Sequence, residues 1–325
     1  MTARMLALLA CGVVAGQAMA QNNVAIYGVV DMGWSHARNG AGSVNSLNSG
    51  LLNGSRLGFK GAEALGNGLT AIFVLENGFA ADTGAMGQGG LLFGRQALVG
   101  LAGRYGTLKL GRQATPVYDN NDVFDPFCNG LAPDSIRLIN YSGSRTNNML
   151  SYSVGAGGWR GQLQYAPGEV AGNSAAGRTL GGYGGYRGGN VDTVLTYQST
   201  ANAAGDVRGS TALAGGNVKF GGITFYAAYA WNRNVTAPGG VIAPGTDMRN
   251  QLLGVSIPTG GAGSIRMSYI TLRDRMAARA DAHQFGLGYI HELSKRTALY
   301  TSAAWLSHER NGSDRLANAG IRHRF

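Results

Sequence analysis

Residues 223–232 read ITFYAAYAWN, and the alternation within this stretch decides the fold. Every second position is apolar or aromatic, beginning with Ile223 and ending with Trp231, and polar Thr224 and Asn232 occupy positions between them. The side chains of a β-strand point alternately to opposite faces, so the stretch predicts a strand with one apolar face and one mixed face.

The same period of two recurs along the chain. It is found in 24–34, 56–60, 69–76, 108–110, 150–154, 162–165, 265–269 and 285–289. Short turns such as 103–106 (GRYG) and 187–190 (RGGN) trade places with long polar stretches such as 37–54 and 167–177. This spacing predicts an up-and-down antiparallel meander. We expect sixteen strands, starting near residues 24, 54, 67, 91, 106, 146, 159, 179, 191, 209, 223, 248, 264, 281, 297 and 314.

Composition favours a membrane barrel over a soluble sandwich, which would also alternate. Only 14% of the 325 residues are charged, against about 25% in ordinary soluble domains. The apolar faces are rich in aromatic residues, whereas the other faces carry Arg, Lys, Gln, Asn, Ser and Gly. Apolar residues facing lipid and polar residues facing a lumen fit this pattern, and a closed barrel pairs every backbone group internally. We therefore predict an all-β, sixteen-stranded antiparallel transmembrane β-barrel in the outer membrane of a Gram-negative cell.

The first twenty residues have the pattern of a secretory signal peptide. A short basic start precedes the apolar stretch 5–16, and Ala18-Met19-Ala20 forms a cleavage site before Gln21. Two alternatives are a membrane anchor, for which the apolar stretch is too short, and a lipoprotein signal around Cys11. We expect export through the periplasm, a barrel domain over residues 21–325 and one remaining thiol, Cys128, so no intrachain disulfide.

Several segments resemble the general porins of Gram-negative bacteria, in the branch typical of betaproteobacteria. They are VAIYGVVDMGW (24–34), NGSRLGFKGAEALGNGLTAIFVLENGF (53–79), LFGRQALVGLAGRYGTLKLGRQATPVYD (92–119), LSKRTALY (293–300) and GIRHRF (320–325). The resemblance covers essentially the whole mature chain. It implies a homotrimer of water-filled barrels, each narrowed by a third long loop that folds inward.

The infolded loop would correspond to about 114–137, the longest interruption in the first half of the chain. It carries Asp119, Asp122 and Asp125, and further along Asp134 and Arg137. By sequence alone these are ordinary turn residues of a solvated loop. The resemblance makes the first three candidates for the acidic side of a pore constriction.

The basic side of that constriction is predicted from parity on the barrel wall. Arg56, Arg95 and Lys109 oppose apolar residues on their strands, and Arg145 is in phase with Ser151 and Ser153. We therefore expect all four to point into the lumen. The segments around the three arginines also resemble those that supply the basic cluster of the family's pore. Lys60 shares the parity but lies nearer the periplasm, whereas Arg112 has the opposite parity.

The function expected from these features is a general diffusion porin that passes ions and small hydrophilic solutes. The net charge is +10, or +9 once Arg4 leaves with the signal peptide, which favours anions. The alternative is a substrate-specific sugar or organic-anion channel of the same architecture, with an aromatic track from Tyr27, Tyr118, Tyr226 and Tyr300. We expect no enzyme activity, no cofactor, no metal site and no nucleic-acid partner, because no catalytic motif is complete and the basic residues are dispersed.

The last nine residues, ANAGIRHRF (317–325), alternate in the same way. They predict a final strand that pairs with 24–34 and closes the barrel, with Phe325 in the periplasmic aromatic girdle. By resemblance, the outer-membrane assembly machinery reads this terminal Phe, and outer-membrane lipid and lipopolysaccharide surround the barrel. His323 falls on the lipid-facing side, where an apolar residue would be expected.

Overall fold

The computed structural model describes residues 23–128, 130–139, 142–236, 241–276, 281–309 and 312–325. The predicted signal peptide therefore lies outside the described residues. One antiparallel sheet contains all the strands of the described residues. Its strands are β1 (Asn23–Asn39), β2 (Gly42–Ser49), β3 (Arg56–Gly66), β4 (Leu69–Gly78), β5 (Gln96–Gly103), β6 (Gly106–Ala114), β7 (Arg145–Ala156), β8 (Trp159–Ala166), β9 (Thr179–Gly188), β10 (Val191–Ala201), β11 (Arg208–Phe220), β12 (Ile223–Thr236), β13 (Val241–Pro258), β14 (Gly263–Asp274), β15 (Ala282–Glu292), β16 (Thr297–His308) and β17 (Gly312–Arg324).

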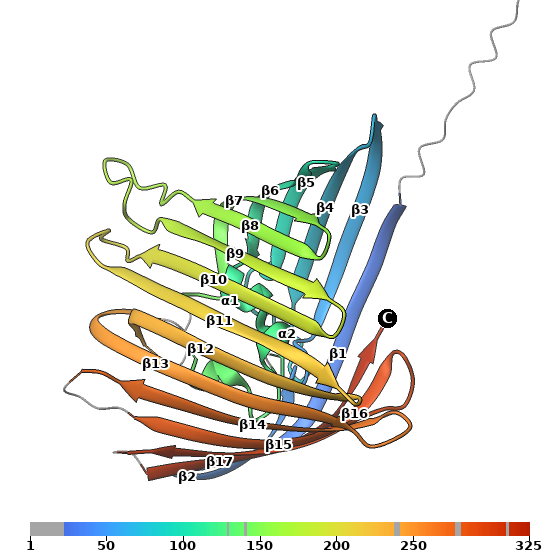
Figure 1. The fold of residues 1–325 in the computed structure, drawn as a ribbon, viewed down its shortest axis with the longest axis vertical. Helices are drawn as coiled ribbons and strands as arrows, with labels where there is room; N and C mark the ends of the chain where they lie inside the picture. The colour runs from blue at the N-terminus through green and yellow to red at the C-terminus, as the bar shows by residue number, and fades with distance from the viewer. Residues whose placement is uncertain (1–22, 129, 140–141, 237–240, 277–280, 310–311) are drawn as a thin grey trace, which may run out of the picture.

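These strands form a closed ring of sixteen positions (Figure 1). Strands β2 and β3 share one position, because β3 pairs with the first part of β1 and β2 pairs with its second part. The sixteen-stranded antiparallel barrel is therefore confirmed. The strand β2 was not expected, because 37–54 was interpreted as a long loop. Strand β13 also starts at Val241, well before the expected 248.

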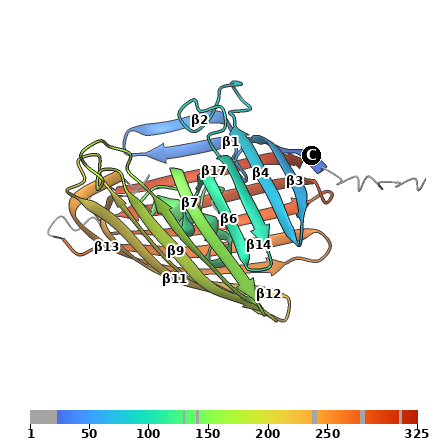
Figure 2. The same cartoon turned by 90° about the horizontal axis from the view of Figure 1, so that it is seen from above.

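The two ends of the chain close the ring. Strand β17 pairs with β1 from Arg324 opposite Val29 to Arg315 opposite Arg38, and the two strands lie side by side in Figure 2. The backbone of Phe325 exchanges two hydrogen bonds of 3.1 Å with Gly28. The pairing predicted for 317–325 is thus confirmed, and the barrel has no free edge.

The predicted orientation of the side chains holds around the barrel. Large apolar residues are exposed on the outer face, including Ile26, Val99, Leu195, Phe225, Leu253 and Trp305. His323 also faces outward, and its Nδ1 lies 2.9 Å from the hydroxyl of Thr297 at the end of the barrel that carries the short turns. A polar partner near this end accounts for an imidazole among apolar neighbours.

The segment between β6 and β7 folds into the barrel and is called loop 3 (115–144). It contains two short helices, α1 (Pro116–Asp119) and α2 (Asn121–Phe124), and a 3₁₀ turn, η1 (Ser135–Arg137), and Figure 1 shows α1 and α2 inside the ring. This confirms the infolded loop, which ends seven residues beyond the expected 137. Among the described residues, no helix has the length and apolar character needed to span a bilayer.

The inner wall is not polar throughout, which differs from the simple alternation rule. Loop 3 packs buried apolar side chains against one side of the wall. The strands on that side carry apolar residues on their inner face. The cluster is formed by Val117, Val123, Phe124, Leu138 and Ile139 from the loop and by Val194, Leu213, Ala228, Ala230, Met248, Leu252, Ile270, Leu272, Ala282 and Leu306 from the wall. Loop 3 is therefore packed against β10–β16, and the open passage lies toward the other strands.

Candidate functional site

Amide and guanidinium side chains of the inner wall hold loop 3 by its carbonyl oxygens. Asn250 donates to the carbonyl of Leu138 at 2.6 Å and Gln284 donates to that of Pro133 at 2.8 Å. Similar bonds run from Gln164 to Ala114, from Asn217 to Val123 and from Arg266 to Pro126. Alternation places these polar residues on the inner face, but their loop partners are 50 to 151 residues away in sequence. Sequence reasoning placed Gln164, Arg266 and Gln284 on the polar faces of their strands and missed the anchoring role of all five residues.

Glycines in the wall make room for the same loop. A Cβ atom added at Gly254 would lie 2.7 Å from Pro126, and one added at Gly286 would lie 2.2 Å from Pro133. Side chains cannot approach that closely, so the loop can reach these strands only where the wall has no Cβ.

The turn between β2 and β3 supports the tip of loop 3. The backbone N–H of Leu131 donates to the carbonyl of Leu51. Buried Asp31 holds this turn, because its carboxylate accepts from the N–H groups of Leu52 (3.1 Å) and Asn53 (2.7 Å) and from the hydroxyl of Tyr300 (2.6 Å). Asp31 thus connects β1, β16 and the turn beside the passage.

Replacing Asp31 by Asn is expected to destabilise the barrel by about 2–4 kcal/mol, because an amide has one acceptor oxygen and cannot serve donors on both sides. Thermal unfolding in detergent, followed by the electrophoretic mobility of the folded form, measures the change. Tyr300→Phe removes a single bond and should cost about 1 kcal/mol. Equal stability of D31N and wild type would show that the carboxylate does not hold the turn.

A cavity of about 360 Å³ lies between the tip of the loop and the wall. Its lining residues are Asn53, Gly54, Arg56, Glu76, Arg95, Gln96, Ala114, Tyr118, Asp119, Asp122, Cys128 and Arg145. The structure therefore brings together the three expected arginines and two of the expected loop carboxylates. Glu76 and Cys128 were not expected there. Alternation in the sequence placed Glu76 on the polar face of its strand, but it gave no sign of the ion pair with Arg95.

The three arginines have different surroundings. Arg95 Nε lies 2.6 Å from Glu76, whose other oxygen accepts from Tyr27 at 2.8 Å, so this charge is compensated. Arg145 lies over the ring of Tyr118, 4.8 Å from its centroid, and donates to the carbonyl of Arg95 at 3.1 Å. Among the described residues, no carboxylate lies within ion-pairing distance of Arg56. The same holds for Arg145, but Arg145 is held by Tyr118 and by the carbonyl of Arg95, so Arg56 is the cavity arginine more available to a passing anion.

The loop carboxylates also separate into two kinds. Asp119 and Asp122 are exposed in the cavity, facing the wall arginines across it. Asp125 is fully buried and accepts from the N–H groups of Phe127 (2.8 Å) and Ser135 (3.1 Å). The structure therefore gives Asp125 a place inside the loop and not on the passage.

Lys109 lies outside the cavity lining. It pairs with Ser151 of β7 and lies five residues before Ala114, the end of β6. Its inward-facing side chain is therefore closer to the short turn at 103–106 than the cavity is. Although Asp119 is accessible from the cavity, the barrel wall surrounds it and displaces water, which raises the pKa of its carboxyl; the charge of Lys109 opposes that shift. Arg112, whose parity was opposite, is turned by a bulge in β6 and donates to the carbonyl of Gly94 at 2.7 Å.

The four tyrosines of the possible aromatic track are not assembled into one. Tyr118 lines the cavity, whereas Tyr300 is buried against Asp31 and Tyr226 packs on the apolar cluster around loop 3. Tyr27 lies beneath Lys60, whose Nζ is 5.2 Å from the ring centroid. This arrangement offers no continuous aromatic surface to a sugar.

Loop 3 also contains a carboxyl that titrates near neutral pH. Burial and, after it, the charge of Asp125 together raise the pKa of Asp134 to about 7. A raised pKa means that the folded loop favours the neutral acid, so this stabilisation is complete below about pH 4 and is lost as pH rises through 7. We expect the free energy that holds loop 3 in its folded conformation to fall by about 1 kcal/mol between pH 6 and pH 8.

Hydrogen exchange of residues 135–139, corrected for the intrinsic rate, tests this pH dependence. Exchange should be faster at pH 8 than at pH 6 in the wild type, and equal at both values in Asp134→Asn. A persisting difference in that variant would assign the effect to another group.

The sequence model of the Gram-negative porin family matches residues 6–311. The chain belongs to this family. Outer membrane porin protein 32 of Delftia acidovorans is 33% identical over 322 residues, which cover 93% of this chain and 89% of that protein. An outer membrane porin protein of Bordetella pertussis is 28% identical over 96% of each chain.

Solved porin structures agree with the fold. The anion-selective porin from Comamonas acidovorans superposes with a TM-score of 0.83 at 28% identity, covering 94% of this chain and 100% of that one. OmpF of Salmonella typhi, at 17% identity, has a TM-score of 0.71 and supports the fold alone. This porin is accordingly an outer-membrane channel protein, and the cavity beside loop 3 is its candidate constriction.

Proposed function

We propose that this porin is a general diffusion channel that passes small hydrophilic solutes and ions and prefers anions. The observation that carries the proposal is the cavity inside the barrel, where Arg56 and Arg145 on the wall face Asp119 and Asp122 on loop 3. Opposite charges across a narrow opening create a transverse field, which orients polar solutes while loop 3 limits their size. We propose no enzymatic role.

The anion preference is supported by further cations on the inner wall. Lys60, Lys109, Arg160 and Arg187 lie on strands β3, β6, β8 and β9, toward the short turns. Arg160 and Arg187 share one carboxylate, that of Asp192, at 2.8 and 2.5 Å. An anion that leaves the constriction thus enters a positive region. The similar porin from Comamonas acidovorans is described as anion-selective.

Reversal potentials across planar bilayers in a KCl gradient test the selectivity. The purified protein should conduct, and the sign of the potential should show chloride as the more permeant ion. Conductance with potassium preference would reject the anion preference and leave the channel function standing. Absence of conductance would reject the channel function.

The alternative function is a substrate-specific sugar or organic-anion channel. The number of cavity arginines favours an organic anion over a sugar, since the tyrosines do not form a track. Dicarboxylates and neutral sugars of equal size should therefore be compared in liposome swelling. Saturable block of the chloride current by a dicarboxylate would support the alternative.

Arg95→Ala should affect stability more than selectivity. The variant leaves the buried Glu76 carboxylate with Tyr27 as its remaining partner, which is expected to cost about 3–5 kcal/mol. The double variant with Glu76→Gln and Arg95→Gln removes both charges and should recover most of the loss. Thermal unfolding in detergent compares them, and a fully stable Arg95→Ala protein would contradict the paired role of Arg95.

We also propose that the mature chain begins after residue 20, assembles as a homotrimer, contacts lipid and lipopolysaccharide, and is read by the assembly machinery through Phe325.

The ring of Phe325 lies over Gly28, where an added Cβ would be 2.3 Å from it, so the terminal residue is seated on the outer wall. Deletion of Phe325 should reduce the amount of folded protein in the membrane fraction. Normal yields would remove Phe325 from this role.

A further inference from the structure

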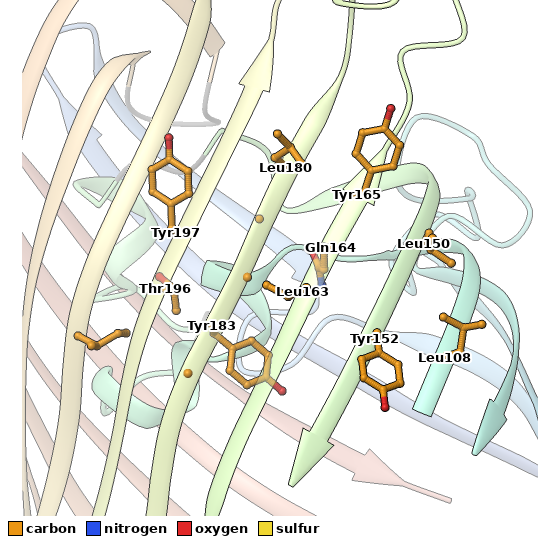
Figure 3. A pocket seen from close by; sticks show the side chains of 14 residues that line it. Leu108, Leu150, Tyr152, Leu163, Gln164, Tyr165, Leu180, Tyr183, Thr196 and Tyr197 are labelled. Carbon is orange, nitrogen blue, oxygen red and sulfur yellow. The ribbon is translucent and has the colours of Figure 1, made fainter. Parts of the chain in front are cut away.

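An apolar groove of about 680 Å³ runs along the outer wall across β7–β10 (Figure 3). Leu163 and Tyr165 of β8 and Leu195 and Tyr197 of β10 flank β9 within it, and its lining continues past β8 to β7 and to Leu108 on β6. All four side chains are exposed, Leu163 to 74%, so the groove faces the lipid.

The floor of the groove is formed by glycines of β9. Gly182 lies between Leu163 and Tyr197 in the register, and Gly184 lies opposite Leu195. At Gly184 an added Cβ would contact nothing within 4 Å. Packing inside the barrel therefore does not require glycine at this position, and the space above it is open to an outside occupant.

A smaller pocket of about 150 Å³ adjoins the groove at its loop-side end. It is lined by Tyr197, which also lines the groove, and by Ser210, Ala212, Trp231, Asn232, Arg233, Asp247 and Arg249. Arg249 pairs with Asp247 at 3.2 Å, and Arg273 on β14 lies opposite Arg249 in the register. Three guanidinium groups thus accompany one carboxylate on the outward face of β12–β14, which we call the basic rim (Arg233, Arg249 and Arg273).

The position of the basic rim is unusual for charged residues. It lies on the lipid-facing side, beyond the aromatic side chain of Trp231 and toward the long loops. In barrels of this kind the long loops are extracellular, so the rim is at the level of the outer headgroups. Charged side chains at that level can bind phosphates in bidentate fashion.

We propose that the groove and the basic rim together bind one phosphorylated lipid of the outer leaflet, with an acyl chain over Gly184 and a phosphate at Arg233, Arg249 and Arg273. Tyr197 lines both the apolar groove and the smaller pocket that contains Arg233 and Arg249. Because the two adjoin at this residue, they can hold the apolar and the charged part of a single amphipathic molecule. Such a site would be where this porin makes the lipopolysaccharide contact proposed above. Lipid binding there depends on the outer-membrane location and not on ion selectivity, so the lipid site and the anion preference can fail separately.

Binding of lipid A to the purified protein in detergent tests the proposal, measured as retained lipid by mass spectrometry. The double variant Arg233→Gln with Arg273→Gln should lower lipid A affinity at least about tenfold, and Gly184→Leu should lower it about fivefold by filling the groove. Phosphatidylethanolamine, which carries no net charge, should bind weakly and lose little affinity in the arginine variant. Inorganic phosphate should compete poorly because it lacks an acyl chain.

Two matched variants control for bulk and charge. Ala227→Leu adds the same side chain on the outward face of β12 outside the groove, and Arg38→Gln with Arg315→Gln removes a facing pair on β1 and β17. Both should bind lipid A like the wild type, and all variants should keep the wild-type conductance. Unchanged affinity in the Arg233 and Arg273 variant, an equal loss in the Arg38 and Arg315 control, or efficient displacement by inorganic phosphate would overturn the proposal.

Discussion

Replacing Arg56 by Glu is expected to lower the ratio of anion to cation permeability at least about fivefold, and to bring it to unity or below. Arg56 lines the cavity opposite Asp119 and Asp122 with no described carboxylate within ion-pairing distance, and unlike Arg145 it is not held over the ring of Tyr118. A reversed charge there acts on every ion that passes within a few ångströms, where an interaction of about 1 kcal/mol changes permeability about fivefold.

Reversal potentials of Arg56→Glu, Arg56→Gln and wild type should form a graded series. Arg38→Glu makes the same change in net charge at an exposed position on the part of β1 that pairs with β2, outside the cavity lining, and should leave selectivity near the wild-type value. If Arg38→Glu shifts the reversal potential as much as Arg56→Glu does, total charge and not the cavity controls selectivity.

Replacing Gly286 by Val is expected to displace loop 3 from the wall into the passage and to lower single-channel conductance. An added Cβ would lie 2.2 Å from Pro133, whose carbonyl accepts the hydrogen bond from Gln284. Overpacking of this kind costs about 1–3 kcal/mol of folding free energy. The loop can relieve the clash by moving away from the wall into the passage, whereas β15 cannot move because it is hydrogen-bonded to a strand on each side. The current should also become noisier, because a loop with fewer anchors samples more positions.

Gly184→Val is the matched control for this prediction. It places the same side chain on a strand glycine with open space outside, so conductance should not change. Exclusion of larger sugars in liposome swelling gives a second measurement, and Gly286→Val should exclude solutes that the wild type admits. Wild-type conductance and size exclusion in Gly286→Val would show that loop 3 does not set the width of the channel.

The fold could be predicted almost completely from local pattern. Alternation in stretches such as 223–232 assigns each residue to a face, and this depends only on the strand's own geometry. Strand β2 was missed because its polar sequence, GSVNSLNS, differs little from that of a loop, and its pairing with β1 stabilises it. Parity also predicted the inward direction of Arg56, Arg95 and Arg145.

The charge state of the passage depends on contacts between distant segments. Whether Arg95 is free or compensated depends on Glu76, which is 19 residues away, and the turn beside it depends on the bond between Asp31 and Tyr300, 269 residues apart. Asp125 and Asp119 look alike in the sequence, yet one is buried in the loop and the other faces the passage.

The sequence by itself therefore determined the barrel, its closure by residues 317–325 and the parity of its wall, because alternation acts between neighbours along the chain. Tertiary structure alone decided which wall residues hold loop 3, which cavity arginine is paired with a carboxylate and where the outer wall forms a groove. These properties arise when the closed ring brings distant strands and loop 3 together, and no period within a single strand records them.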